Sequence, residues 1–404
     1  MIRPSIEALP VSRIREVANA GLGRTDVLKF WFGEGDHVTP EFIRAAAKAA
    51  LDAGETFYNH NLGIAELRET LAAYCTRLHR PEVPVTADRI AVTSAGVHAL
   101  ALVDQALIDP GDRVVIVTPV WPNLTSMPRI MSANVVRVAL DCRGGQWTLD
   151  LQRLLDAATP DTRLVLVNSP NNPTGWTMPQ RDWDALLAHC RRHGIWLVSD
   201  DAYERLVFEP GLTIDGHAPG VQAQLDDEDR VISANTFSKS WTMTGWRLGW
   251  LVLPAALVPA VEKLAQNLFI CPSTLAQHAA LACFESESIA TYEQRRAEFR
   301  ARRDFLVPAL ESLGLPVPVM PDGAFYAWAD CSRFVADTRD PARGGSWQFA
   351  DELMRGAHVA VTPGRDFGRA DTARYVRFSY ANSMAQLTDA VRRLGEVLPA
   401  MARP

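Results

Sequence analysis

The chain has 404 residues, of which 48% are hydrophobic and 22% charged, and its formal net charge at pH 7 is −6. This composition is typical of a folded protein with a large core, and it excludes a disordered, collagen-like or coiled-coil chain. The 41 basic residues are scattered and outnumbered by 47 acidic ones, which argues against nucleic acid as a partner.

The first 45 residues show no repeating pattern, and we expect them to form an arm that packs on a smaller domain. From about residue 85 to residue 255, short β-branched runs alternate with stretches of helical period. The predicted strands are 89–93, 113–118, 135–140, 163–168, 195–199, 230–235 and 247–252, and the predicted helices between them are 97–108, 123–132, 149–157 and 179–193. Such alternation predicts an α/β fold with a mostly parallel sheet sandwiched by helices.

The pattern changes after residue 254, where helical stretches follow one another without strands. They include a long charged helix over residues 289–313, which we expect to connect two domains. A smaller α/β set comes next, with strands at 324–329, 358–361 and 375–380, a helix near 347–356 and a terminal helix from 384. We therefore predict an arm that is part of the small domain (1–45), a large cofactor-binding domain (46–288) and a small C-terminal domain (289–404).

Cysteine spacing and hydropathy bear on the compartment. The six cysteines lie far apart and include no Cys-x-x-Cys pair, which favours reduced thiols and a cytoplasmic protein. The longest apolar run, residues 248–261, contains two prolines and is shorter than the ~20 residues that a membrane helix needs. We expect no membrane-spanning segment and, because the N-terminus lacks an apolar core, no signal peptide.

Polar or aromatic residues follow five of the predicted strands. This matters because an open parallel sheet binds its ligands beyond the carboxyl ends of its strands. Residues 93–98 are mostly small and open a helix, whose free N–H groups suit a phosphate. Trp121 follows the second strand and is placed to stack on a flat ring. Residues 168–175 form a rigid polar turn that can aim an amide inward.

The last two junctions carry ionisable groups. Asp200 and Tyr203 follow the fifth strand, and Lys239 follows the sixth. The other three lysines, at 29, 48 and 263, lie on predicted helices or in a turn, whereas burial at a strand end would disfavour the charge of Lys239. With Arg247, this set matches the needs of pyridoxal phosphate: an imine-forming lysine, an acid for the pyridine nitrogen, and phosphate anchors.

The sequence resembles the class I/II aminotransferases of the aspartate aminotransferase superfamily, the fold-type I pyridoxal phosphate enzymes. The likeness runs from Gly33-Glu34-Gly35-Asp36 to Arg377, and its most specific blocks are residues 238–249 and Asn171-Asn172-Pro173-Thr174-Gly175. Gly323-Ala324-Phe325-Tyr326 resembles a further block of the family. The resemblance implies a transaminase that uses pyridoxal 5'-phosphate to move an amino group from an L-amino acid to a 2-oxo acid by a ping-pong mechanism.

The resemblance also implies roles for single residues. Lys239 would bind the cofactor as an imine and then shuttle the substrate proton, and Asp200 would pair with the pyridinium nitrogen. Asn172 and Tyr203 would hydrogen-bond the phenolic oxygen of the cofactor, and Trp121 would stack on its ring. The phosphate would be held by Gly96, Val97, His98, Thr236 and Arg247.

Substrate and subunit contacts are implied in the same way. Arg377 matches the arginine that grips the substrate α-carboxylate, while Gly35 and Asn172 would border the substrate. Tyr58 matches a tyrosine that reaches the phosphate of the neighbouring subunit, which implies a homodimer. Gly35 and His37 stand where the family usually has Pro and Phe, so the identity of the amino donor and of the oxo-acid acceptor stays open.

Two other functions use the same residues. A lyase acting by β-elimination would need the same lysine, aspartate and arginine, and a non-catalytic binding protein would retain the fold and use the cofactor or an amino acid as a signal. No metal site is expected: His189 and His193 lie four residues apart on a predicted helix, but there is no His-Glu-x-x-His pattern and no evident third ligand.

Overall fold

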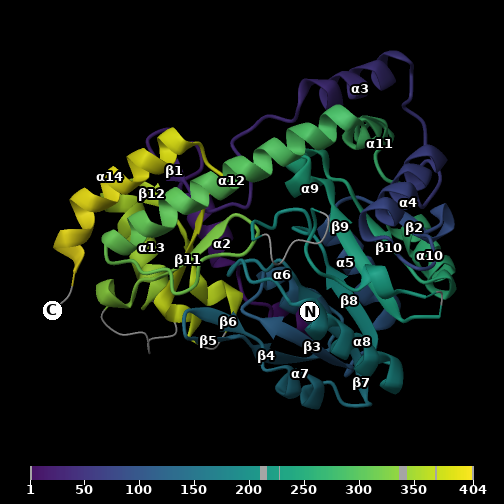
Figure 1. Cartoon of the computed structure of the whole chain (residues 1–404), viewed down its shortest axis with the longest axis horizontal. Helices are drawn as coiled ribbons and strands as arrows, with labels where there is room; N and C mark the ends of the chain where they lie inside the picture. Colours follow the sequence, from purple (N-terminus) through teal and green to yellow (C-terminus); the bar gives the residue numbers. More distant parts are fainter. Residues whose placement is uncertain (1, 210–215, 227, 336–343, 369–370, 403–404) are drawn as a thin grey trace.

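The centre of the molecule is a seven-stranded sheet, seen in a computed structural model that describes residues 2–209, 216–226, 228–335, 344–368 and 371–402 (Figure 1). Its strand order is β2-β10-β9-β8-β7-β3-β4. The bounds are Ile90–Thr93 (β2), Arg113–Thr118 (β3), Asn134–Ala139 (β4), Thr162–Asn168 (β7), Trp196–Asp200 (β8), Val231–Thr236 (β9) and Gly249–Val252 (β10). The pairs from β9 to β4 are parallel, and β10 runs against both of its neighbours. The expected fold class is confirmed, and each predicted strand of this sheet lies within two residues of an observed one.

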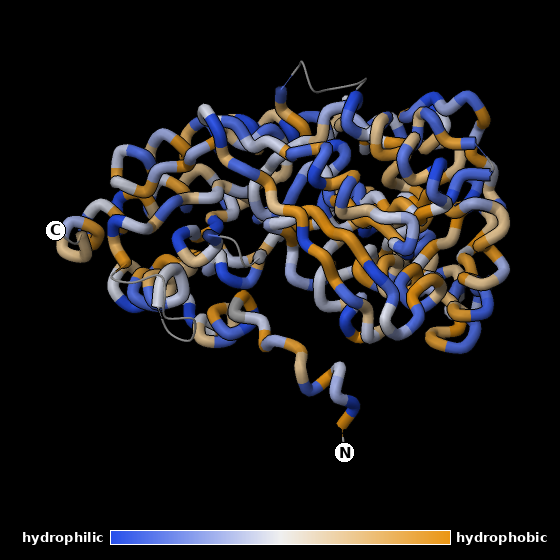
Figure 2. The backbone as a smooth tube through the Cα atoms, turned by 90° about the horizontal axis from the view of Figure 1, so that it is seen from below, coloured by the Kyte–Doolittle hydropathy of each residue, from blue (hydrophilic) through white to orange (hydrophobic). Residues whose placement is uncertain are grey.

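The sheet is buried on both faces because its strands are apolar at consecutive positions. Along β3, Val114 and Ile116 belong to one hydrophobic cluster and Val115 and Val117 to another, as the alternation of side chains in a strand requires. The first cluster includes residues of α5 (Gly96–Leu107), α6 (Pro122–Ile130) and α10 (Val258–Leu268), and the second includes residues of α7 (Leu151–Ala157) and α8 (Gln180–His193). Figure 2 shows the hydrophobic backbone stretches concentrated inside this body.

The smaller α/β unit lies at the other end of α12 (Ser286–Ser312), the long helix that runs between the two bodies in Figure 1. Its antiparallel sheet has the order β11-β14-β13, formed by Tyr326–Asp330, Tyr375–Ser379 and Thr362–Pro363. It also contains α13 (Ser346–Gly356) and α14 (Met384–Met401). The N-terminal arm contributes β1 (Leu28–Lys29), which pairs in parallel with β12 (Val359–Ala360), and α2 (Arg13–Ala20), which contacts α13 and β13.

Several elements were not specified by the sequence pattern. They are α1 (Pro4–Glu7), α4 (Ala65–His79), α9 (Phe237–Ser240), α11 (Thr274–Leu281) and the hairpin of β5 (Asp141–Arg143) and β6 (Gln146–Thr148), whereas α3 (Glu41–Asp52) was expected only as a helix around Lys48, without bounds. The expected domain boundaries at 45/46 and 288/289 fall inside α3 and α12, so the division of the chain stays a prediction. No helix among the described residues is long and apolar enough to cross a membrane.

Candidate active site

One edge of the large sheet collects the residues singled out by the sequence. Because β10 is antiparallel to both β2 and β9, strand β2 runs in the same direction as β9, β8, β7 and β3. The carboxyl ends of these strands therefore share one edge, and Arg247, just before β10, reaches the same edge from the opposite direction. This edge carries the segments that hold Gly96, Val97, His98, Trp121, Asn172, Asp200, Tyr203, Thr236, Lys239 and Arg247.

Lys239 lies on the short helix α9, immediately after β9. The Oγ1 of Thr236 caps this helix by accepting a hydrogen bond from the N–H of Ser238 at 3.1 Å. The Nζ of Lys239 donates to the carbonyl oxygen of Gly33 at 2.6 Å. Burial, helped by the positive charge of Arg377, lowers the pKa of Lys239 to about 8. A sizeable fraction of this amine is neutral near pH 8, which is the form that attacks carbonyl carbon or accepts a proton.

Asp200 ends β8 and is 6% exposed. Its Oδ1 accepts a hydrogen bond from the N–H of Ala202 at 3.3 Å, a long contact that compensates little of the charge. Burial, together with the neighbouring charge of Asp201, raises the pKa of Asp200 to about 7. The ionised form of a buried carboxylate with few hydrogen bonds is strongly stabilised by a cationic N–H donor, and a pyridinium nitrogen is such a donor.

The start of α5 fits closely against the ends of β9 and β10. A Cβ at Gly96 would lie 3.0 Å from the Cβ of Thr236, and a Cβ at Gly249 would lie 2.5 Å from the backbone nitrogen of Gly96. The two glycines therefore allow a helix N-terminus, with its unpaired N–H groups, to reach the sheet edge near Arg247. The N–H of His98 donates to Ala95 O at 3.1 Å and its ring lies 4.4 Å from that of Phe269, so a phosphate contact from His98 stays a prediction.

Arg377 comes from β14 of the small unit and is 2% exposed. Its Nη1 donates to Asn172 Oδ1 at 2.7 Å, and its Nη2 donates to the carbonyl oxygen of Trp31 at 2.5 Å. The guanidinium carbon lies 4.2 Å from the centroid of the Tyr326 ring. In the described part of the chain, the buried Nε of Arg377 has no hydrogen-bond partner. A charged, partly unfilled donor set at this place fits a carboxylate ligand.

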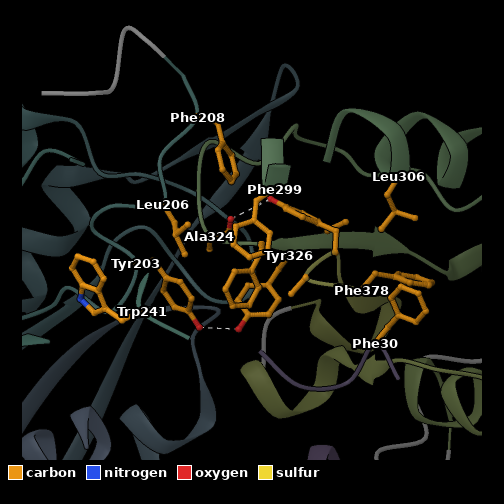
Figure 3. Close-up of a cluster of buried hydrophobic side chains, with 14 of the residues drawn as sticks. Phe30, Tyr203, Leu206, Phe208, Trp241, Phe299, Leu306, Ala324, Tyr326 and Phe378 are labelled. Atoms are coloured by element: carbon orange, nitrogen blue, oxygen red, sulfur yellow. Dashed lines mark hydrogen bonds between the residues drawn. The ribbon is translucent and has the colours of Figure 1, made fainter. Parts of the chain in front are cut away.

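Tyr326, on β11, is a residue of the site to which the sequence assigned no role. The hydroxyl oxygens of Tyr203 and Tyr326 lie 2.8 Å apart, in hydrogen-bond contact across the two bodies (Figure 3). A Cβ at Gly33 would lie 1.9 Å from the Tyr326 hydroxyl, so Gly33 must be glycine for the N-terminal segment to pass over this pair. The resemblance of residues 323–326 to a family block was the available signal, without a role attached to it.

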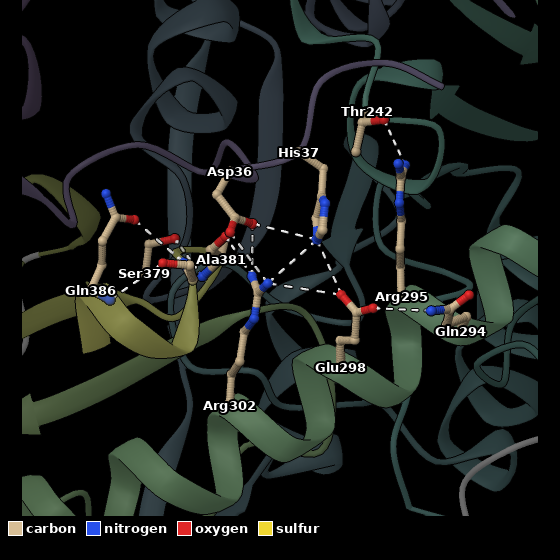
Figure 4. A network of polar contacts seen from close by, with 11 residues as sticks. Asp36, His37, Thr242, Gln294, Arg295, Glu298, Arg302, Ser379, Ala381 and Gln386 are labelled. Atoms are coloured by element: carbon tan, nitrogen blue, oxygen red, sulfur yellow. Dashed lines mark hydrogen bonds and ion pairs between the residues drawn. The ribbon is translucent and has the colours of Figure 1, made fainter. Parts of the chain in front are cut away.

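A polar network holds the segment that follows Gly33 (Figure 4). Asp36 forms an ion pair with Arg302 of α12 at 2.8 Å, and His37 lies 3.1 Å from Glu298 of the same helix. A Cβ at Gly35 would have its nearest neighbours at 4.0 Å, so packing does not require glycine there, and the substrate-bordering role of Gly35 stays a prediction. These partners were missed because α12 is far from residues 33–39 in the sequence.

Tyr58 and Trp121 differ in how they relate to this edge. Tyr58 is 81% exposed, and its loop is fastened to residues near 274 because Asn59 Nδ2 donates to Thr274 Oγ1 at 2.8 Å. Within the described chain, no hydrogen bond or ring contact of the Tyr58 side chain joins it to the site. Trp121 is half-buried just before α6, next to the end of β3.

The residues at this edge fit pyridoxal phosphate by their chemistry. A buried lysine of lowered pKa supplies the imine-forming amine, and a buried carboxylate matches the pyridinium nitrogen. The glycine-lined start of α5, with Arg247 beside it, matches a phosphate group.

Comparisons with known proteins point to the same chemistry. A family model described as aminotransferase class I and II matches residues 26–394. The aspartate/prephenate aminotransferase of Thermus thermophilus is 35% identical over 98% of this chain and 97% of its own length. The valine–pyruvate aminotransferase of Mycobacterium tuberculosis is 33% identical over 93% of this chain and 92% of its own. The solved structure of Thermus thermophilus aspartate aminotransferase with maleate superposes with a TM-score of 0.88 at 34% identity, covering 98% of this chain and 99% of that one.

Proposed function

Because the chain belongs to the class I and II aminotransferases, and is therefore a pyridoxal phosphate-dependent transaminase, we propose that Lys239 binds the cofactor and moves the substrate proton. The observation that carries this assignment is the buried Nζ of Lys239, with its pKa lowered to about 8, beside Asp200, Arg247 and Arg377. The family assignment favours amino transfer over both alternatives, β-elimination and non-catalytic binding.

Each residue of the edge has a task in this scheme. The bound cofactor supplies an electron sink that makes the Cα–H bond of the amino acid acidic. The Nζ of Lys239 would accept that proton from Cα and pass it to C4′ of the cofactor, and it would carry a proton in the reverse direction in the second half-reaction. Asp200 holds a proton on the ring nitrogen through its carboxylate, and Tyr203 and Asn172 donate hydrogen bonds to the phenolic oxygen. Gly96, Val97, Thr236 and Arg247 bind the phosphate, while Trp121 covers the ring.

Arg377 is the proposed anchor of the substrate α-carboxylate. Its planar fork matches a carboxylate in two-pronged geometry, and Asn172 already binds one arm of it at 2.7 Å. Both half-reactions use this anchor, since the amino acid and the 2-oxo acid carry the same carboxylate. The side chain of the donor is not fixed by Arg377, and the relatives are named for substrates as different as valine and aspartate.

We further propose that the active unit is a homodimer in which Tyr58 reaches the partner's phosphate site. The support is the 81% exposure of the Tyr58 ring in an otherwise fastened loop. Phe57 is equally exposed, and Ile270, whose carbonyl oxygen accepts a hydrogen bond from Asn61 of the same loop at 2.6 Å, is exposed as well. Mixing Tyr58→Ala chains with Lys239→Ala chains tests this, because the mixed dimer regains one site with both residues intact. Recovery of cofactor affinity and activity is expected, and absence of recovery in a proven mixed dimer contradicts the assignment.

We propose a cytoplasmic location because the cysteines are unpaired. All six, at 75, 142, 190, 271, 283 and 331, are free thiols, and four of them are buried. Unpaired buried thiols suit a reducing compartment.

The first experiment is an absorption spectrum of the purified protein, repeated as single amino acids are added. We expect the visible band of lysine-bound cofactor, and its conversion to pyridoxamine phosphate by particular donors in one turnover. Aspartate, valine, alanine and aromatic amino acids form the panel. Release of ammonia and an oxo acid without any acceptor indicates elimination instead, and failure of every donor to convert the cofactor contradicts the proposed transfer.

A further inference from the structure

A buried ion pair lies behind the site and takes no part in the mechanism above. Glu204 directly follows Tyr203, and its Oε2 lies 3.1 Å from Nε2 of His79, in the last turn of α4. Both side chains are buried. Burial raises the pKa of Glu204, but the neighbouring His79 and His217 and the hydrogen bond from Asn235 outweigh burial and leave that pKa below its usual range. Glu204 is therefore a charged carboxylate inside the large domain.

The other carboxylate oxygen of Glu204 leads toward the cofactor edge. Its Oε1 accepts a hydrogen bond from Asn235 Nδ2 at 2.8 Å, and Asn235 Oδ1 accepts one from the backbone N–H of Thr236 at 2.8 Å. Because a carboxylate has no proton to donate, the amide of Asn235 must turn its NH2 group to Glu204 and its oxygen to Thr236. The acceptor oxygen of Glu204 and the N–H donor of Thr236 thus fix the orientation of Asn235 between them, and Asn235 links Glu204 to the backbone of Thr236.

The Asn235–Thr236 segment, which these hydrogen bonds reach, lies directly beneath the proposed phosphate site at the start of α5. A Cβ at Gly96 would lie 3.2 Å from the carbonyl oxygen of Asn235, and a Cβ at Gly249 would lie 2.7 Å from the same oxygen. Thr236 also caps the helix that carries Lys239. A shift of Asn235 therefore displaces the start of α5 and the end of β9 together.

We propose that Glu204 is a positioning residue for the phosphate end of the cofactor site, acting through Asn235 on Thr236. This inference rests on the assignment of Gly96 and Thr236 to the phosphate. It explains why the chain buries the carboxylate of Glu204 beside His79 at this place, since a buried polar pair gains little stability over apolar packing. A purely structural ion pair would stabilise the fold without distinguishing one end of the cofactor from the other.

The test compares two ligands that differ only in the phosphate. Cofactor-depleted full-length protein is titrated with pyridoxal phosphate and with pyridoxal, and the ratio of the two dissociation constants measures the phosphate contribution. Glu204→Ala is expected to weaken pyridoxal phosphate binding by about tenfold or more, as loss of a charged hydrogen bond does, and to change pyridoxal binding by less than about threefold. Glu204→Gln keeps an oxygen that can accept from Asn235, and it should restore most of the ratio.

Two further variants keep the proposal falsifiable. Asn235→Ala leaves the ion pair in place and breaks only the link to Thr236, so it should show the same selective loss even where Glu204→Ala does not fold. Asp201→Asn is the matched control, because Asp201 is a buried acid of the same turn that binds Ser233 and Gln222 instead. It should lower the melting temperature and leave the ratio unchanged.

The outcomes separate this inference from the assignment on which it rests. A native protein that binds pyridoxal and pyridoxal phosphate equally well refutes the phosphate site itself and the positioning role with it. A native protein that prefers pyridoxal phosphate, combined with a wild-type ratio in Asn235→Ala or an equal loss of both ligands in Glu204→Ala, overturns the positioning role alone.

Discussion

Replacing Lys239 by methionine should stabilise the cofactor-free protein at neutral pH. Burial lowers the pKa of this lysine from 10.5 to about 8, and each pH unit corresponds to about 1.4 kcal/mol. The full fall corresponds to about 3.5 kcal/mol, and because the side chain as a whole is only half-buried, solvent screening reduces the cost of its charge to about 2 to 3 kcal/mol. Methionine cannot donate the hydrogen bond that Lys239 makes to the carbonyl oxygen of Gly33, and this loss offsets about 1 kcal/mol of the gain in stability. Lys239→Met, which removes the charge and keeps the length, is expected to gain about 1 to 2 kcal/mol at pH 7.

The stability gained by Lys239→Met should depend on pH in a defined way. Below pH 8 the lysine is charged in both the folded and the unfolded chain, so its cost is fully present. Between pH 8 and 10.5 the folded chain loses the proton first, and the cost shrinks as the pH rises. The advantage of Lys239→Met should therefore disappear by about pH 10.

Urea unfolding of the cofactor-free protein at pH 7 and pH 10, at one protein concentration, measures this difference. Lys263→Met is the control, since Lys263 is exposed on α10 and should show no such gain. A Lys239→Met protein that is less stable than the native one at pH 7, or a gain that does not change with pH, would refute the reasoning.

Three other expectations follow from the geometry of the site. Arg377→Lys keeps the charge but not the fork, and kcat/KM should fall by about 10- to 100-fold with an unchanged cofactor spectrum; an unchanged KM and kcat would contradict its role. Asp200→Asn removes the charge opposite the ring nitrogen, and the single-turnover rate should fall by about 100-fold or more; a rate near the native one would count against the pairing. Asp36→Ala and Arg302→Ala should each destabilise the protein, and a double-mutant cycle should give a coupling of about 1 kcal/mol or more, whereas additive losses would mean that the ion pair at 2.8 Å contributes nothing.

The sheet was predictable because its strands are buried on both faces and so read as short, continuous apolar runs between helices. The β5–β6 hairpin was missed, although Gly144 and Gly145 form its turn with φ of 57° and 74°. A Gly-Gly pair with positive φ is a hairpin signal, and the strands on either side were too short to reveal themselves by alternation. The small pairing of β1 with β12 was beyond reach, since it joins residues 28–29 to 359–360.

The residues of the site likewise fall into those that local sequence patterns identify and those that only the folded chain brings together. Residues at the ends of parallel strands, such as Asp200 and Lys239, could be named because the fold brings successive strand ends to one edge. The contacts of Asp36 with Arg302 and of Tyr203 with Tyr326 could not be named, because no local pattern pairs residues 266 and 123 positions apart. Arg302 also lies on the long charged helix that was expected only to connect two domains, and its side chain is only 8% exposed.

These missed contacts decide how the segment over the site is held once the cofactor is bound. In the free chain, Lys239 Nζ donates to the carbonyl oxygen of Gly33, so the lysine itself helps to fasten residues 33–39. A lysine bonded to the cofactor has its nitrogen committed there, and Gly33 loses that donor. The segment is then held by the Asp36–Arg302 ion pair and the His37–Glu298 contact on α12. Removing Asp36 should therefore loosen this segment more in the loaded enzyme than in the free protein, which hydrogen exchange of residues 33–39 in the two states would measure.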